Sequence, residues 1–207
     1  MILAGGKSSR MGRDKATIEI DGIPMLRRIY DVVAGCNDRV IKSIAGAEGK
    51  PFASISVVTP WMERYQSILP SDCNFIAEES PHQGSLMGFA QGLSQIEADW
   101  LLLLACDLPN LSSSFIQNSI EQLRDIPTES MAYLAKCDRG WEPLCGFYRG
   151  NCLDSLREYI NSGGKSFQGW LKTKIVTELS IDNPQILLNC NTPADLAEII
   201  NYHSPTP

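Results

Sequence analysis

A glycine-rich segment near the start of the chain combines backbone freedom with a high density of positive charge. Four cationic side chains lie within nine residues: Lys7, Arg10, Arg13 and Lys15. Just before them, Gly5 and Gly6 let the backbone turn sharply and present N–H groups to an anion. In a chain whose net charge is -6, this local reversal of charge favours a polyanionic ligand, and a nucleoside triphosphate would account for it.

The alternative is an exposed turn whose lysines and arginines are simply solvated. Neither the P-loop pattern G-x-x-x-x-G-K-[ST] nor the dinucleotide pattern G-x-G-x-x-G occurs in the segment. A strand, two glycines, four cations and a further glycine in succession nevertheless favour the phosphate interpretation. We therefore predict that the backbone N–H groups of residues 4–6, together with Lys15 and Arg10, hold a triphosphate.

Asp107 follows the most apolar run of the chain, residues 100–105. Such a run is typical of a strand buried on both faces, and the carboxyl end of that strand opens into the crevice where open α/β sheets bind ligands. Mg²⁺ prefers one or two carboxylates together with phosphate oxygens and water. Asp107 is therefore a candidate magnesium ligand beside the triphosphate; the alternative is an aspartate that caps a turn.

Two asparagines late in the chain form a further candidate site. Asn189 and Asn191 flank one cysteine and precede Thr192. Alternation after an expected strand at 186–188 would place both amides on one side, next to a helix N-terminus that suits a phosphate or a pterin. The alternative is that Thr192 caps the helix while the asparagines satisfy turn backbone.

The elements that must position these residues alternate between strands and helices. The expected strands cover residues 1–4, 16–20, 55–59, 74–77, 100–105, 131–135, 144–148, 175–179 and 186–188. The expected helices cover residues 24–34, 61–69, 84–96, 112–124, 151–160, 167–171 and 193–202. An extended connection is expected at 37–53 and a frayed tail at 203–207. This order predicts an α/β fold with a Rossmann-like, doubly wound and mostly parallel sheet.

Composition narrows the class of protein further. The chain has 207 residues, of which 43% are hydrophobic and 20% charged, and no linker is visible, so we predict a single domain over residues 1–207. An acidic chain without a basic run is a poor candidate for binding nucleic acid. The longest apolar run, 100–106, is far shorter than the ~20 residues that a membrane helix needs.

The seven cysteines are scattered and contain no C-x-x-C pair, and only His82 and His203 could assist them as metal ligands. A zinc site is therefore not expected. Reduced, mostly buried thiols and the lack of a visible signal peptide predict a cytoplasmic protein.

The segment LAGGKSSRMGRDK, from Leu3 to Lys15, closely resembles the signature L-A-G-G-x-S-x-R-M-G-x-D-K of molybdenum cofactor guanylyltransferases, and it matches at every fixed position. The resemblance extends from Met1 to about Tyr202, and it is also strong at ACDLP (105–109) and NCNTPADL (189–196). It implies a Rossmann-like nucleotidyltransferase fold with GTP in the N-terminal half and molybdopterin in the C-terminal half. The implied reaction joins GMP from Mg-GTP to the phosphate of molybdopterin and releases pyrophosphate.

The resemblance also implies roles for individual residues. GTP would be bound by Leu3, Ala4, Gly5, Gly6, Lys15, Glu78 and Asp107. The catalytic residues would be Lys15, Arg10 and Asp107, with Asp107 holding Mg²⁺. Molybdopterin would be held by Asn189 and Asn191, and the proteins that insert or accept the finished cofactor would be further partners. Related cytidylyltransferases carry Ala at the place of Gly5, so the glycine predicts GTP, with the missing methyl leaving room for the purine.

The chain departs from the family pattern at four places. Thr59 replaces an Asn, Ser85 replaces a Pro, and either Glu78 or Glu79 replaces an Asp that would contact the guanine or ribose. Only two residues precede Leu3, which indicates either a start further upstream or a shortened strand. These departures leave open a cytidylyl- or sugar-phosphate nucleotidyltransferase, or a nucleotide-binding regulator without catalysis.

Overall fold

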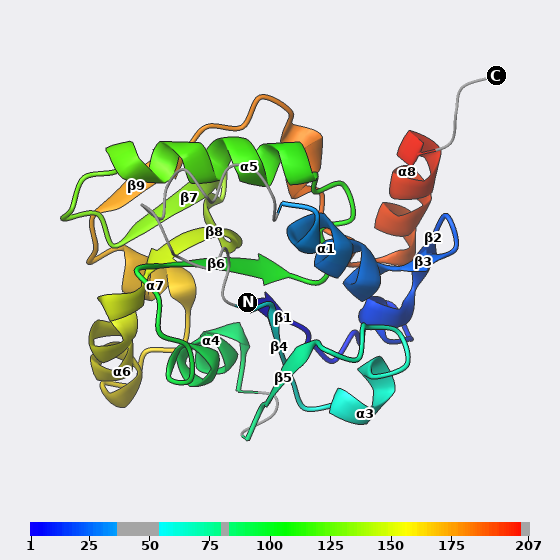
Figure 1. The fold of residues 1–207 in the computed structure, drawn as a ribbon, viewed down its shortest axis with the longest axis horizontal. Helices are drawn as coiled ribbons and strands as arrows, with labels where there is room; N and C mark the ends of the chain where they lie inside the picture. The colour runs from blue at the N-terminus through cyan, green and yellow to red at the C-terminus, as the bar shows by residue number, and fades with distance from the viewer. Residues whose placement is uncertain (37–53, 80–82, 204–207) are drawn as a thin grey trace.

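Strands in the order β5-β4-β1-β6-β8-β7-β9 form the central sheet of the computed structural model (Figure 1). The structure describes residues 1–36, 54–79 and 83–203. The bounds of the seven strands in this sheet are β1 Ile2–Leu3, β4 Ser56–Thr59, β5 Asn74–Ala77, β6 Trp100–Ala105, β7 Ala132–Cys137, β8 Gly140–Arg149 and β9 Val176–Leu179. The predicted connection at 37–53 and the tail beyond residue 203 lie outside the described residues.

The predicted α/β fold with a mostly parallel sheet is confirmed. β1 runs parallel to β4 and β6, β4 runs parallel to β5, and β7 runs parallel to β9. Only β8, among the described strands of this sheet, runs antiparallel to its two neighbours, β6 and β7. The carboxyl ends of β1, β4, β5 and β6 therefore meet at one edge, and this is the edge where such sheets bind ligands.

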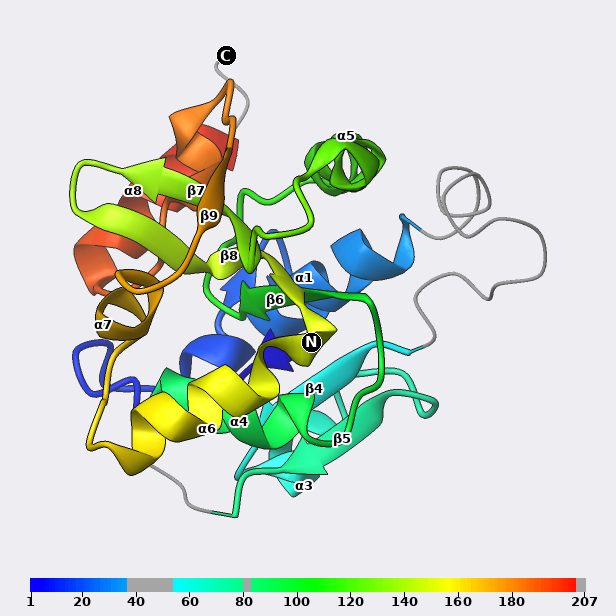
Figure 2. The same cartoon turned by 90° about the vertical axis from the view of Figure 1, so that its left-hand side faces the viewer.

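Helices cover both faces of the sheet (Figure 2). Their bounds are α1 Met25–Ala34, α3 Met62–Tyr65, α4 Ser85–Leu93, α5 Ser113–Gln122, α6 Leu153–Asn161, α7 Phe167–Leu171 and α8 Pro193–His203. Short 3-10 turns cover η1 Lys15–Thr17, η2 Leu123–Asp125, η3 Gly150–Cys152 and η4 Pro184–Leu187. A small separate hairpin pairs β2 Glu19–Ile20 with β3 Ile23–Pro24. None of the described helices has the length and apolar character that crossing a bilayer requires.

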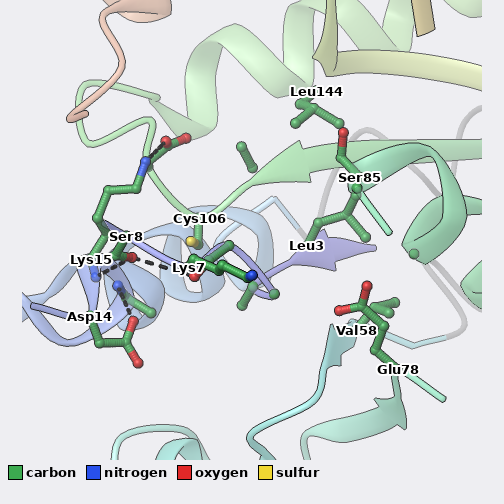
Figure 3. A pocket seen from close by; sticks show the side chains of 18 of the residues that line it. Leu3, Lys7, Ser8, Asp14, Lys15, Val58, Glu78, Ser85, Cys106 and Leu144 are labelled. Atoms are coloured by element: carbon green, nitrogen blue, oxygen red, sulfur yellow. Dashed lines mark hydrogen bonds and ion pairs between the residues drawn. The ribbon is translucent and has the colours of Figure 1, made fainter. Parts of the chain in front are cut away.

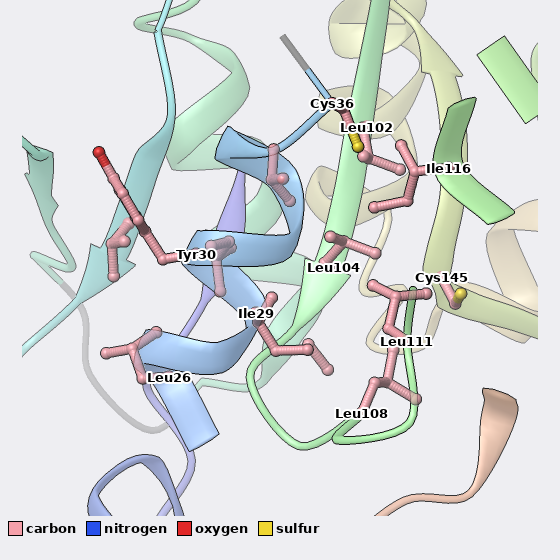
Figure 4. Packing of buried hydrophobic residues seen from close by; sticks show 14 of the residues in the cluster. Leu26, Ile29, Tyr30, Cys36, Leu102, Leu104, Leu108, Leu111, Ile116 and Cys145 are labelled. Carbon is pink, nitrogen blue, oxygen red and sulfur yellow. The ribbon is translucent and has the colours of Figure 1, made fainter. Parts of the chain in front are cut away.

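β6 divides the core into two layers because its side chains alternate between the two faces. Leu102 and Leu104 pack with α1 and α5 (Figure 4), whereas Leu101 and Leu103 pack with α4, α6 and α7. All four leucines are buried, as the unbroken apolar run predicts. A rigid, doubly covered β6 fixes the position of the residues that follow it, including Asp107.

The structure corrects three predicted elements. Residues 16–20 are not one strand: Lys15–Thr17 forms η1, because the Asp14 carboxylate accepts a hydrogen bond from the Ala16 N–H and caps a 3-10 turn. Residues 186–188 lie at the end of η4 and not in a strand, since the Asn183 side chain caps a turn that begins at Pro184. The helix expected at 61–69 ends at Tyr65, after which the chain tightens into turns.

Candidate functional site

A cavity of about 280 Å³ opens at the carboxyl edge of the sheet. Its walls come from the glycine-rich loop, the ends of β4 and β6, the residue after β5 and the start of α4 (Figure 3). The residues that the family resemblance assigns to GTP binding all line it: Leu3, Ala4, Gly5, Gly6, Lys15, Glu78 and Asp107. Arg10, Asn189 and Asn191 are not among its described lining residues, although Arg10 and Asn191 contact each other beside it.

The glycine-rich loop is closed by its own hydrogen bonds. The Met11 N–H donates to the Ser8 carbonyl at 3.0 Å, and the Lys15 N–H donates to the Ser8 hydroxyl at 3.1 Å. Gly12 has a φ of 67°, a left-handed conformation that glycine adopts without steric cost. The loop therefore folds back toward the sheet and places Lys15 at the same pocket that Gly5 and Gly6 line.

Asp14 and Tyr65 fix the turn from which Lys15 projects. One carboxylate oxygen of Asp14 accepts the Ala16 N–H at 3.1 Å, and the other accepts the Tyr65 hydroxyl at 2.9 Å. Tyr65 is buried, and this burial, with the neighbouring Asp14 carboxylate, raises the pKa of Tyr65, so the hydroxyl remains a donor. The sequence analysis missed Tyr65, because nothing in its local pattern distinguishes it from a core aromatic residue.

The ammonium group of Lys15 joins two distant parts of the chain. Its Nζ lies 2.6 Å from Asp107 Oδ2 and 2.8 Å from Asn191 Oδ1. The Arg10 guanidinium donates to the same Asn191 oxygen at 3.3 Å. In addition, the Cys190 N–H donates to the Asp107 carbonyl at 3.0 Å. The two segments recognised separately in the sequence, 105–109 and 189–196, are therefore bonded to each other and to Lys15.

Asp107 has the features of a carboxylate that lacks one partner. The residue is 9% exposed, and its Oδ2 is occupied by Lys15. Its Oδ1 is buried without a hydrogen-bond partner among the described residues. No group of three or more His, Cys, Asp or Glu side chains suited to a metal occurs in the described part of the chain. A lone, free carboxylate oxygen fits Mg²⁺ that arrives with a nucleotide, because phosphates and water supply its other ligands.

The opposite end of the pocket is formed by Glu78 and two glycines. Glu78 follows β5, its N–H donates to the Thr59 carbonyl at 3.1 Å, and its side chain lines the pocket, whereas Glu79 is exposed. A Cβ on Gly5 would overlap Glu78 Oε2, and one on Gly88 would lie 3.7 Å from Oε1. Burial raises the pKa of the Glu78 carboxyl. Gly5 therefore leaves space for this carboxylate.

Thr59 and Ser85, the departures from the family pattern, have different surroundings. Thr59 is buried; its hydroxyl donates to the Ala4 carbonyl at 2.9 Å and accepts the Trp61 N–H at 3.1 Å. It therefore supports the loop from beneath. Ser85 lines the pocket as the first residue of α4, after Gly84, whose φ is 96°.

The two asparagines do not face the same way. Because η4 replaces the expected strand, the alternation that would have paired them is absent. Asn189 Nδ2 donates to the Leu187 carbonyl at 3.1 Å, as the turn interpretation predicts, while Asn191 faces Lys15. The predicted cap is present, since the Asp195 N–H donates to the Thr192 hydroxyl at 3.2 Å.

Comparisons with known proteins match most of this chain. The family model of the MobA-like NTP transferase domain matches residues 1–176. A probable molybdenum cofactor guanylyltransferase from Nostoc sp. is 46% identical and covers 96% of this chain and 88% of the relative. One from Synechococcus elongatus is 39% identical and covers 94% of both.

Solved structures share the fold. The crystal structure of molybdopterin-guanine dinucleotide biosynthesis protein A from Archaeoglobus fulgidus aligns with a TM-score of 0.74 at 19% identity, covering 97% of this chain and 96% of that one. A 4-diphosphocytidyl-2C-methyl-D-erythritol synthase from Anaerococcus prevotii aligns with a TM-score of 0.66 at 14% identity, covering 97% and 93%. At these identities the likeness concerns the fold alone.

Proposed function

The chain belongs to the molybdenum cofactor guanylyltransferases, nucleotidyltransferases with a MobA-like NTP transferase domain, and on this premise we propose that it transfers GMP from Mg-GTP to molybdopterin. The products are molybdopterin guanine dinucleotide and pyrophosphate. The observation that carries the proposal is the convergence of the glycine-rich loop, Lys15, Asp107 and Glu78 on one cavity.

In this reaction an oxygen of the molybdopterin phosphate attacks the α-phosphorus of GTP. The bond between the α-phosphorus and the bridging oxygen to the β-phosphate breaks, and pyrophosphate leaves with that oxygen. The attacking phosphate is already anionic at neutral pH, so the site needs no strong general base. Alignment of the two phosphates and neutralisation of charge supply the catalysis.

The phosphate end of the pocket would hold the triphosphate. The Ala4 N–H, which the sequence pattern also assigned to it, already donates to the Val58 carbonyl at 2.9 Å. The N–H groups of Gly5 and Gly6, the Lys15 ammonium and the Arg10 guanidinium would therefore contact it. Asp107 Oδ1 is the free carboxylate oxygen that would hold Mg²⁺. When bound, Mg²⁺ stabilises charge on the α-phosphate and on the leaving pyrophosphate.

The base end of the pocket would read guanine. The Glu78 carboxylate can accept two hydrogen bonds from the N1–H and N2–H₂ edge of guanine, whereas Glu79 is exposed and is not among the described lining residues. Gly5 supports this assignment because the carboxylate occupies the volume that an alanine methyl would take. The expected effect of Gly5 on base preference is therefore exerted through Glu78, in addition to the room it leaves for the purine.

The acceptor side is assigned to the segment that carries the two asparagines. We assign molybdopterin to Asn189 and Asn191, which lie beside Asp107 and Lys15. The finished cofactor would pass to proteins that insert or accept it. All seven cysteines are free thiols, which favours the cytoplasm as the compartment of the reaction.

A pyrophosphate-release assay with molybdopterin, Mg²⁺ and either GTP or CTP tests the proposal. We expect release with GTP, little with CTP, and none without molybdopterin. A preference for CTP would identify a cytidylyltransferase instead, and turnover with a sugar 1-phosphate in place of molybdopterin would identify a sugar-phosphate enzyme. Binding of GTP without any turnover would leave a nucleotide-binding regulator.

A further inference from the structure

The segment 189–195 is bonded to the predicted triphosphate residues. Asn191 Oδ1 accepts hydrogen bonds from Lys15 and Arg10, at 2.8 Å and 3.3 Å. Behind it, Asp195 Oδ2 accepts the N–H groups of Asn191 and Thr192, each at 2.8 Å. We propose that Asp195 is a positioning residue of the nucleotide site, which acts through Asn191 on the Lys15 ammonium.

The chemistry of the three side chains suits this role. Lys15 must keep its positive charge available for a phosphate, and the amide oxygen of Asn191 orients the ammonium without neutralising it. A carboxylate at the same place would compete with the phosphate. Asp195 instead directs one oxygen to two backbone N–H groups, so its charge fixes the turn that carries Asn191.

Burial increases the importance of this orientation. The side chains of Lys15 and Asp107 are only 15% and 12% exposed, so few water molecules can replace a lost contact. If Asn191 moved away, Asp107 would remain the one acidic partner of Lys15 in the described structure, and the ammonium would be drawn toward the carboxylate assigned to Mg²⁺. Asn191 thus orients Lys15 for the nucleotide, in addition to its assigned contact with the acceptor.

The inference rests on the proposed nucleotide site, and its competitor is a purely structural capping role. Asp195 and Thr192 form the two halves of a capping box at the start of α8. Thr192→Ala would remove the hydroxyl half but leave the bond from the Asn191 N–H to Asp195. It is therefore the matched control for loss of helix stability.

The test is titration calorimetry of Mg-GTP without any acceptor, at a temperature where every variant is folded. We expect Asp195→Ala to weaken Mg-GTP binding about tenfold, the smaller loss seen when the hydrogen-bond partner behind a metal ligand is removed. Asp195→Asn keeps the shape of the side chain and one acceptor oxygen, so it should lose less affinity for Mg-GTP than Asp195→Ala. Thr192→Ala should lower Tm while retaining the wild-type Kd. Asn191→Ala should weaken binding, and adding Asp195→Ala to it should change the Kd little further.

The outcomes separate the two proposals. Wild-type affinity in folded Asp195→Ala would overturn the positioning role alone, as would equal weakening in Thr192→Ala. Additive losses in the double variant would also overturn it, because Asp195 would then act by another route. If the wild-type chain itself bound no Mg-GTP, the proposed function would fail and this inference with it.

Discussion

At the phosphate end of the pocket, side chains form hydrogen bonds with one another, whereas at the base end the Glu78 carboxylate lies against glycines. Lys15 contacts both Asp107 and Asn191 there. Among the described residues, the Glu78 carboxylate has no side-chain hydrogen bond, and it borders Gly5 and Gly88. The first region is ordered by its contacts before a ligand arrives, and the second is shaped by the absence of side chains.

This difference predicts that one end of the pocket controls the rate of turnover and the other controls the preference for one nucleotide over another. A group that neutralises developing charge acts on the transition state, so its loss lowers turnover for any nucleotide. A carboxylate that reads one edge of a base distinguishes one nucleotide from another, so its displacement changes the ratio of rates. Substitutions at the two ends should therefore fail in different ways.

The largest effects are expected at the phosphate end. Lys15→Ala and Asp107→Ala should each lower GMP transfer by about 10²–10³, because each removes a charge placed at the reacting phosphates. Pyrophosphate release under saturating Mg-GTP measures this loss, and circular dichroism checks that the fold survives. The ratio of GTP to CTP turnover should stay as in the wild type. Wild-type turnover in either folded variant would contradict the assigned roles.

An intermediate effect is expected from Gly5→Ala. The new methyl would overlap Glu78 Oε2, and because this is the far end of a flexible side chain, the carboxylate should turn away and leave the backbone in place. We expect the preference for GTP over CTP to fall about tenfold, the order of discrimination that one methyl group commonly provides.

Two further variants show whether Gly5 acts through Glu78. Glu78→Ala should lower the preference by itself, and combining it with Gly5→Ala should add little. Gly88→Ala is the matched comparison, since its Cβ would lie at an ordinary 3.7 Å from Glu78 Oε1 and should perturb the preference less. Full additivity between Gly5→Ala and Glu78→Ala would instead favour direct contact between residue 5 and the base.

The smallest effect is a pH dependence at the base end. Burial raises the pKa of Glu78, so the carboxyl becomes protonated at a higher pH than an exposed glutamate. Protonation removes acceptors for guanine, and we expect the Kd of Mg-GTP to rise as the pH falls through this raised pKa. The same shift means that Glu78 favours folding at low pH, a contribution lost as the pH rises through its folded-state pKa. Glu78→Gln has no titrating carboxyl and should lose this pH dependence. Subtracting its titration from that of the wild type isolates the Glu78 contribution, because the protonation of GTP itself is common to both proteins.

Local patterns in the sequence were enough to predict much of the pocket. The segment around Gly5 and Gly6 and the apolar run before Asp107 each encode a strand followed by a turn that lines the pocket. Residues 167–171 form the predicted helix, α7, because Ser166 caps its start. The strand predicted at 186–188 is wrong because the Asn183 cap and Pro184 favour a 3-10 turn over the same residues.

Contacts between distant segments could not be predicted from those patterns. The closeness of Gly5 to Glu78 depends on the pairing of β4 with β1 and β5. The bond from Tyr65 to Asp14 depends on where α3 packs. The motif containing Asn191 indicated a ligand, but its sequence gave no sign that Lys15 would be its partner in the folded chain.

The bond between Lys15 and Asn191 joins residues 176 positions apart in the chain. Forming it requires closure of a very long loop, and contacts of that kind are gained late in folding because their entropy cost precedes their reward. Triphosphate binding through Lys15, as proposed, therefore requires the two ends of the described chain to be folded together. A ligand that binds only the folded state shifts the folding equilibrium toward it, so Mg-GTP, the proposed ligand, should raise the Tm of the chain.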